Sequence, residues 1–341
     1  MKPSIARKRK VETAPERLRA PARFALSGWY PKRMESEAFN SLVILGPTAS
    51  GKTRLGVALA AELDGEILSA DSRQVYRGLD IGSGKDLDEY TVEGRAIPYH
   101  LIDIVDLDTE YNAYKYQRDF YAVFEGLMAR AALPVAVGGT GLYLDAVLQG
   151  FRMVETPENN GLRSELESHS DDELALQLRS LKPKLHNTTD LTERARMIRA
   201  IEIEIYARDN PPPPAPSIRP LVLGAYWERT ELRARIRQRL KDRLNQGLIE
   251  EVERLLDRGV GKRRLHSLGL EYRYVSDYLG GAIKSRNDLM QQLAGAICQF
   301  ARRQDTWFRR MERKGAKIQW VDRGDPDAAM AIYRAKWHVH A

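Results

Sequence analysis

The amino-acid sequence predicts an α/β protein in which a parallel sheet is covered by helices and interrupted by a helical insertion. Over residues 42–148, short apolar runs alternate with segments of helical periodicity, which is typical of parallel strands joined by crossover helices. The first run leads into a glycine-rich loop and then a helix. Residues 151–216 break this alternation and end in a proline-rich stretch, which excludes a helix or an inner strand there.

Each expected element follows from its local pattern. Short apolar runs predict strands buried on both faces, and leucines at helical spacing predict helices packed by one stripe. Because parallel strands end at one edge of a sheet, residues that follow them converge in one crevice. Gly46, Asp71 and Thr140 each follow such a strand. The expected strands are residues 42–45, 67–70, 101–105, 134–139 and 221–226, and the expected helices are 52–63, 114–130, 142–148, 230–258 and 289–314.

Composition divides the chain into five parts. Residues 1–40 hold 10 Lys and Arg against 4 Asp and Glu, so they contribute +6 of the net charge of +7. Their Arg, Pro and Ala content predicts a disordered basic leader, and Met34 within it is a second candidate start. The other parts are the first half of the core (41–150), the helical insertion over the crevice (151–216), the return to the core with C-terminal helices (217–325) and a tail (326–341).

Several classes of protein are excluded by composition. No apolar run approaches the ~20 residues of a transmembrane helix, and the basic N-terminus has no apolar signal segment. Cys298 is the single cysteine among the 341 residues, which excludes an internal disulfide framework and a cysteine-ligated zinc site. We therefore expect a cytoplasmic protein. Since no coiled coil or exposed apolar helix is evident, we expect a monomer.

The glycine-rich loop carries the strongest local motif. Residues 46–53 fit G-x-x-x-x-G-K-[ST] between a strand and a helix, which identifies a P-loop and predicts a P-loop NTPase-like core. Its N–H groups and helix N-terminus bind a diphosphate, Lys52 adds a positive charge, and the Thr53 hydroxyl can hold Mg²⁺. The loop does not specify ATP. The carboxylates that hold Mg²⁺ in a kinase or ATPase are poorly represented in the sequence. The expected diphosphate-binding residues are Gly46, Pro47, Thr48, Ala49, Ser50, Gly51, Lys52 and Thr53.

Six later segments, in order, resemble the conserved blocks of tRNA dimethylallyltransferases. The resemblance covers about residues 41–322. It includes the D-S-x-Q-V-Y-x-G-x-D-I-G, H-L-I-D and G-G-T-x-L-Y signatures of that family. The segments are DSRQVYRGLDIG (71–82), HLID (100–103), GGTGLY (138–143), QGLIEEV (246–252), LGLEYR (268–273) and RQDTWF (303–308).

The resemblance implies a reaction and the residues for it. Dimethylallyl diphosphate would bind the P-loop with Mg²⁺, and the N6 amine of the adenine 3′-adjacent to the anticodon would attack the allylic carbon. Asp71 matches the general base, and Lys52 would stabilise the departing diphosphate. Thr140 matches a threonine that contacts the reacting region. From the residues alone, Asp71 can also cap a turn and Thr140 can cap a helix.

The helix expected from residue 230 carries two rows of side chains. Leucines and an isoleucine recur every four residues, and Arg235, Arg239 and Arg243 flank them. Arg239 lies nearest the apolar side and aligns with a family arginine directed at the diphosphate. The alternative is a surface arginine whose apolar stem packs on the protein.

The resemblance also implies contacts with tRNA. The target adenine would leave the stack of the anticodon loop to enter the crevice, and the insertion would cover the crevice as a tRNA-contacting lid. At two positions the sequence departs from the family pattern: Ala195 replaces a glutamine, and Glu271 stands where a glycine is common. A glutamate beside RNA phosphates is unexpected, so we expect Glu271 to point inward. The expected tRNA-binding residues are Asp71, Ser72, Arg73, Gln74, Thr140, Arg163, Arg196, Arg199 and Arg273.

Three alternatives remain open from the sequence. A P-loop kinase of a nucleoside or small metabolite leaves the 71–82 and 138–143 blocks unexplained. Prenyl transfer to free AMP leaves the insertion and the long basic C-terminal helices without a purpose. A non-catalytic RNA-binding relative is disfavoured by the intact Lys52, Thr53 and Asp71.

Overall fold

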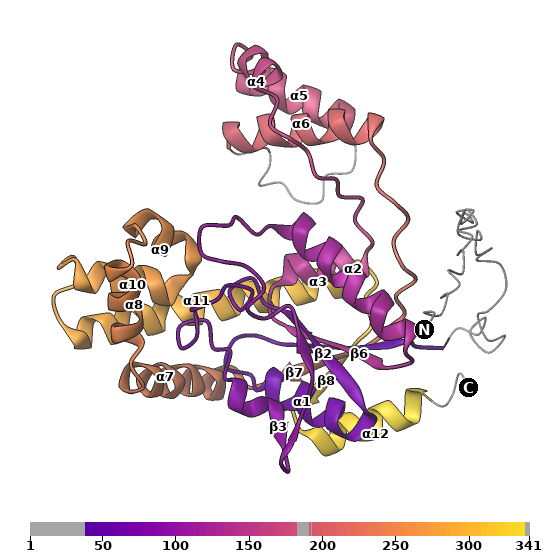
Figure 1. The fold of residues 1–341 in the computed structure, drawn as a ribbon, viewed down its shortest axis with the longest axis vertical. Coiled ribbons are helices and arrows are strands. Elements are labelled where there is room, and N and C mark those ends of the chain that lie inside the picture. The colour runs from indigo at the N-terminus through magenta and orange to yellow at the C-terminus, as the bar shows by residue number, and fades with distance from the viewer. Residues whose placement is uncertain (1–37, 183–190, 192, 338–341) are drawn as a thin grey trace, which may run out of the picture. The chain divides into compact units, whose positions relative to one another are not determined.

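A six-stranded parallel sheet forms the core of the protein (Figure 1). The computed structural model describes residues 38–182, 191 and 193–337. Its strand order is β5-β2-β6-β1-β7-β8, and every neighbouring pair is parallel, so the predicted fold class is confirmed. The strands are β1 (Ser41–Leu45), β2 (Gly65–Ala70), β5 (Tyr99–His100), β6 (Leu133–Gly138), β7 (Pro220–Tyr226) and β8 (Ile318–Asp322).

Helices cover both faces of this sheet. Because strand side chains alternate, Leu42 and Ile44 of β1 pack towards one layer of helices, whereas Val43 and Leu45 pack towards the other. The first layer is α1 (Lys52–Leu63) and α12 (Pro326–Trp337). The second is α2 (Ala113–Ala129), α3 (Gly141–Leu148) and part of α11 (Arg286–Arg313).

A third apolar cluster holds the loop that follows β2 against the C-terminal helices. Val75, Tyr76 and Leu79 of that loop are buried among these helices, which draws the loop across the ends of the strands. A 3-10 turn (Leu87–Tyr90) and a small hairpin, β3 (Thr91–Val92) and β4 (Arg95–Ala96), follow the loop. The helices are α7 (Arg229–Asn245), α8 (Leu248–Asp257), α9 (Lys262–Leu268), α10 (Leu270–Leu279) and α11.

The part of the insertion that the structure describes contains three helices and no strand. Its three helices bury a small apolar cluster of their own, which includes Leu174, Leu178 and Ile201. Extended segments precede the first helix and follow the last (Figure 1). The helices are α4 (Asn160–Leu166), α5 (Asp171–Leu181) and α6 (Arg194–Asp209).

Several expected elements differ from the observed ones. The strand expected at 101–105 is wrong: Leu101 and Asp103 have φ of 65° and 54°, a left-handed conformation that ends the strand at His100. The helix expected over 230–258 is broken at Gly247, whose φ is 103°. The tail expected at 326–341 includes α12, which packs on the core, and β8 was missed because its polar residues obscure the apolar pattern. The leader expected at 1–40 lies almost wholly outside the described residues. Among the helices that the structure describes, none is long and apolar enough to cross a membrane.

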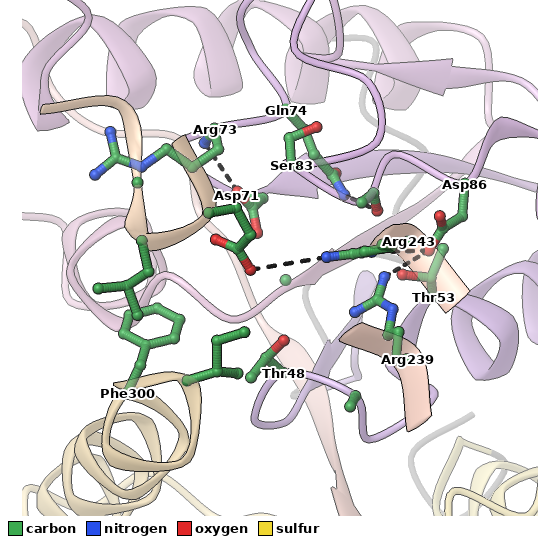
Figure 2. Close-up of a pocket in the computed structure, with 18 of the residues that line it drawn as sticks. Thr48, Thr53, Asp71, Arg73, Gln74, Ser83, Asp86, Arg239, Arg243 and Phe300 are labelled. Carbon is green, nitrogen blue, oxygen red and sulfur yellow. Dashed lines mark hydrogen bonds and ion pairs between the residues drawn. The ribbon is translucent and has the colours of Figure 1, made fainter. Parts of the chain in front are cut away.

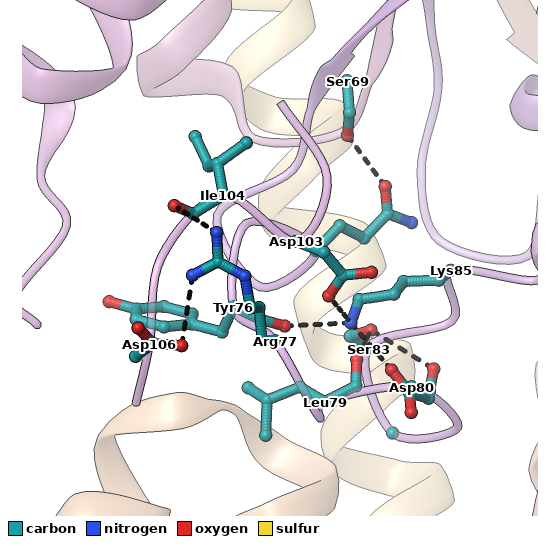
Figure 3. A network of polar contacts seen from close by, with 12 residues as sticks. Ser69, Tyr76, Arg77, Leu79, Asp80, Ser83, Lys85, Asp103, Ile104 and Asp106 are labelled. Atoms are coloured by element: carbon teal, nitrogen blue, oxygen red, sulfur yellow. Dashed lines mark hydrogen bonds and ion pairs between the residues drawn. The ribbon is translucent and has the colours of Figure 1, made fainter. Parts of the chain in front are cut away.

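Lys85 anchors the loop between β2 and the 3-10 turn from within (Figure 3). Its side chain is 2% exposed. The ammonium donates to the carbonyl oxygen of Tyr76 (2.9 Å), to Oδ1 of Asp80 (2.8 Å) and to Oδ1 of Asp103. One buried cation therefore ties the loop to itself and to the segment after β5.

We expect Lys85→Met to lower the free energy of unfolding by about 2 kcal/mol, because two carboxylates and a carbonyl lose a charged donor. The loss is smaller than for a wholly buried pair, since Asp80 and Asp103 reach solvent. Urea denaturation measures it. Lys241→Met, at an exposed lysine of α7, is the control, and equal midpoints for the two variants would refute the anchoring role.

Candidate active site

A cavity of about 620 Å³ opens where β1, β2 and β6 end. Residues from segments distant in sequence line it together, among them Lys52, Asp71, Thr140 and Arg239. Figure 2 shows Asp71 and Arg239 among the side chains that line this cavity. The convergence expected from the strand ends is therefore present.

The P-loop is shaped to bind an anion. Ala49 and Gly51 take left-handed conformations, with φ of 63° and 79°, and no side-chain hydrogen bond caps the start of α1. Two side chains hold carbonyl oxygens of the loop. Arg235 Nε donates to the Ala49 oxygen (2.9 Å), and Trp227 Nε1 donates to the Ser50 oxygen (2.8 Å). Gly51 is the N-cap residue and α1 itself begins at Lys52; uncapped N–H groups at the start of a helix attract phosphate.

Five of the eight expected diphosphate-binding residues line the cavity, and three support the loop. Gly46 packs closely, since a Cβ there would lie 2.6 Å from Ser50 Oγ, and Ser50 is wholly buried. The Pro47 oxygen accepts hydrogen bonds from Ser50 N (3.3 Å) and from Lys52 Nζ (3.4 Å). The lining residues are Thr48, Ala49, Gly51, Lys52 and Thr53.

Gln304 joins the P-loop to the end of β6, a role that the sequence did not predict. This buried residue of α11 accepts from Thr48 N (2.8 Å) and donates to the Gly139 oxygen (2.8 Å). The signal available in the sequence was a polar amide at an inward position of a long amphipathic helix, within the 303–308 block. Buried amides require such partners.

Lys52 has an electrostatic environment unlike that of a surface lysine. Burial in the cavity lowers its pKa to about 8, Asp71 opposes this shift, and Arg239 and Arg243 add to it. These residues are therefore close enough to act on one another. An ammonium with a depressed pKa is a common feature of functional sites.

Asp71 and Thr140 are held across the ends of β2 and β6. Asp71 Oδ1 accepts from Arg73 N (2.8 Å), an interaction that orients the carboxylate at the cavity wall (Figure 2). The Thr140 hydroxyl accepts from Ser72 N (3.1 Å) and makes no cap of α3. Thr140 therefore occupies the N-cap position of α3 without a capping hydrogen bond from its side chain, and its hydroxyl instead links the two loops.

Gln74 lines the same cavity but uses its amide inside the protein. Its Oε1 accepts from Ser69 Oγ (2.8 Å) and its Nε2 donates to the Gly84 oxygen (2.9 Å). With both ends of the amide engaged and the side chain 7% exposed, Gln74 fixes the loop that carries Asp71.

Four charged side chains alternate in sign across the cavity wall. Asp86 Oδ2 forms ion pairs with Arg239 and, at 3.7 Å, with Arg243 (Figure 2). Arg243 Nη1 lies 3.8 Å from Oε1 of Glu271. Glu271 is thus turned inward, as expected, towards an arginine for which the sequence predicted no specific role. Burial raises the pKa of the Glu271 carboxyl, and Arg243 opposes that shift.

The remaining predicted tRNA-binding residues are divided between cavity and insertion. Arg73 and Arg273 line the cavity. Arg163 and Arg199 both pair with Glu202, whose side chain is 1% exposed. Arg196 pairs with Glu193 at 3.0 Å. The three arginines of the insertion contribute to its own ion pairs and do not line the cavity.

Comparisons with known proteins identify relatives of nearly the whole chain. The family model for IPP transferase matches residues 74–311, and that for isopentenyl transferase matches residues 39–97. The tRNA dimethylallyltransferase 2 of Syntrophotalea carbinolica is 58% identical over 84% of this chain and 96% of its own length. The tRNA dimethylallyltransferase 1 of Geotalea uraniireducens is 57% identical over 84% of this chain and 94% of its own length.

A solved structure shows the same likeness in three dimensions. The full-length tRNA isopentenylpyrophosphate transferase of Bacillus halodurans superimposes with a TM-score of 0.63 at 32% identity. The match covers 88% of this chain and 98% of that one. The P-loop, the blocks that converge on one cavity and relatives more than half identical lead to one conclusion: this chain belongs to the tRNA dimethylallyltransferase family of prenyl-transferring enzymes.

Proposed function

We propose that this enzyme transfers the dimethylallyl group of dimethylallyl diphosphate to the N6 amine of the adenine 3′-adjacent to the anticodon in tRNA. The observation that carries the proposal is the placement of the P-loop, Asp71 and Thr140 around one cavity, in a chain of this family. The cavity holds an anion-binding loop on one side and a carboxylate on the other, which are the two groups that the reaction needs.

The reaction breaks one bond and forms another. The diphosphate of the donor binds at residues 49–53, and the bond between its bridging oxygen and the allylic carbon breaks with the electron pair leaving on oxygen. Lys52 and Arg239 stabilise the negative charge that develops there. The adenine N6 forms the new bond to carbon, and its proton passes to the carboxylate of Asp71.

We infer that Mg²⁺ accompanies the diphosphate. In the described part of the chain, no cluster of three His, Cys, Asp or Glu side chains is arranged to hold a metal alone. The Thr53 hydroxyl lies in the cavity beside the phosphate-binding loop. One hydroxyl together with substrate phosphate oxygens and water suits Mg²⁺, which keeps several waters and is rarely caged by protein. The ion would screen diphosphate charge.

The acceptor is a base taken out of its stack. A cavity whose lining residues lie at strand ends can admit a single nucleotide extruded from the anticodon loop. We propose that Ser72, Arg73, Thr140 and Arg273 contact the RNA near the reacting base, with Gln74 acting through the loop it supports. Arg163, Arg196 and Arg199 would contact tRNA from the insertion, in addition to their ion pairs. A monomer in the cytoplasm is consistent with this role.

Incubation with labelled dimethylallyl diphosphate, Mg²⁺ and one of three acceptors tests the proposal. With unmodified tRNA the label enters RNA, whereas with AMP or no acceptor it stays in the donor. Label in AMP would instead support an adenylate prenyltransferase. ATP turnover with phosphoryl transfer and no prenylation would support the kinase alternative, and RNA binding without turnover would support a non-catalytic relative.

A further inference from the structure

Arg243 is a buried arginine whose donor groups the protein leaves partly unused. It follows Arg239 by four residues on α7, so the two side chains project from the same face of the helix. Its side chain is 8% exposed. Yet Nε and Nη2 have no hydrogen-bond partner among the described residues. Buried donors without acceptors are costly, which indicates that something else supplies acceptors at this place.

The carboxylates beside Arg243 neutralise its charge without satisfying its donors. Asp86 Oδ2 lies 3.7 Å from Nη2, and Glu271 Oε1 lies 3.8 Å from Nη1. Both distances exceed a hydrogen bond, so the attraction is electrostatic. The two acids therefore hold the guanidinium in the cavity while leaving its N–H groups for a ligand.

The guanidinium groups of Arg239 and Arg243 converge on one point. A Cβ built on Gly84 would lie 2.6 Å from Nη2 of Arg239 and 1.8 Å from Nη2 of Arg243, so glycine at this position makes room for both. A single carboxylate oxygen of Asp86 forms ion pairs with both (Figure 2). Both arginines also influence Lys52 of the P-loop. Three cations thus surround the place where the P-loop binds an anion.

We propose that Arg243 is a further diphosphate-binding residue, which joins Arg239 and Lys52 in stabilising the departing diphosphate. Asp86 and Glu271 position its guanidinium. The proposal rests on the proposed function, because it takes the cavity as the donor site. The planar guanidinium offers parallel N–H donors that match two phosphate oxygens. No bond forms or breaks at Arg243. Its guanidinium stabilises the negative charge that develops on the diphosphate as the carbon–oxygen bond breaks.

Titration calorimetry of the full-length enzyme with inorganic pyrophosphate and Mg²⁺ tests this role. We expect Arg243→Met to weaken pyrophosphate binding about 10- to 100-fold, as for loss of hydrogen bonds to a charged group, and to raise KM for the donor. Arg243→Lys keeps the positive charge but loses the planar guanidinium, so its pyrophosphate affinity should lie between those of wild type and Arg243→Met. Arg237→Met, at an exposed arginine of the same helix outside the cavity, is the matched control, with binding within about twofold of wild type.

A second measurement separates binding from folding. The affinity for the tRNA anticodon stem-loop should stay within about threefold in Arg243→Met, since no RNA contact is removed. If Arg243→Met is poorly folded, the pair Arg243→Met with Glu271→Gln removes both buried charges and should fold while still binding pyrophosphate weakly. Wild-type pyrophosphate affinity in a folded variant, with only a lower melting temperature, overturns the proposal. If wild type binds pyrophosphate but prenylates no tRNA, the proposed function fails and the Arg243 assignment stands.

Discussion

Asp71→Asn should lower kcat for tRNA prenylation by about 10² to 10⁴-fold, the range of a general base. The amide keeps the size of the side chain and an oxygen that can accept from Arg73 N, but it cannot take a proton from the adenine amine. That amine is a weak nucleophile because its lone pair is delocalised into the ring. Single-turnover kinetics with labelled donor and saturating tRNA measure the loss.

The binding steps should survive this substitution. Affinity for the anticodon stem-loop should change little, because the amide keeps the size of the side chain and its hydrogen bond to Arg73 N. Asp106→Asn, at a surface acid paired with Arg77, serves as the control and should keep full activity. A folded Asp71→Asn enzyme with kcat within threefold of wild type would remove Asp71 from the role of base, a threshold far below the ~10²-fold minimum expected.

Lys52→Met should lower kcat/KM for dimethylallyl diphosphate by about 10² to 10³-fold, as expected when a preorganised donor to a developing anion is removed. Lys52 is the first residue of α1 and lies in the cavity, where its charge adds to that of the helix N-terminus. Binding of the tRNA stem-loop provides the control. If Lys52→Met retained donor affinity and turnover, the diphosphate would have to bind elsewhere.

The same residue sets a pH dependence with a definite sign. The pKa of Lys52 is lowered to about 8, so in the donor-free enzyme its ammonium is lost as pH rises through 8, well before an ordinary lysine. Since the charged form binds the diphosphate, kcat/KM for the donor should fall above pH 8 by up to about tenfold per unit, one proton being involved. Lys52→Arg stays protonated and should abolish this decline. An unchanged decline in Lys52→Arg would assign it to another group.

The fold and the centre of the site were predictable from local pattern. The alternation of apolar runs and helical stripes predicted the sheet, and the motif at 46–53 predicted the anion-binding loop. Asp71 and Thr140 were placed because they end strands, and parallel strands end at one edge. The errors are also local in origin: Leu101 and Asp103 take left-handed conformations that an apolar run does not reveal.

The partners of the polar side chains were not predictable in the same way. Gln304 bonds to Thr48, 256 residues away in sequence. Gln74, which we expected among the tRNA-binding residues, forms hydrogen bonds with Ser69 and Gly84 that the sequence did not reveal. Arg163 and Arg199 share the buried Glu202. In each case the residue type was evident, but its partner depended on which elements pack together.

The sequence by itself determined most element types and the phosphate-binding loop, because backbone preference and periodicity act over a few residues. Its six conserved blocks indicated the family. Only the tertiary structure decided that Arg243 meets Asp86 and Glu271 in the cavity that the P-loop also lines. Those contacts join three segments whose approach is set by the burial of the loop after β2 beneath the C-terminal helices. The strength of each charge–charge interaction at such a site depends on the distance between the groups and on their burial, and both are set only when the chain folds.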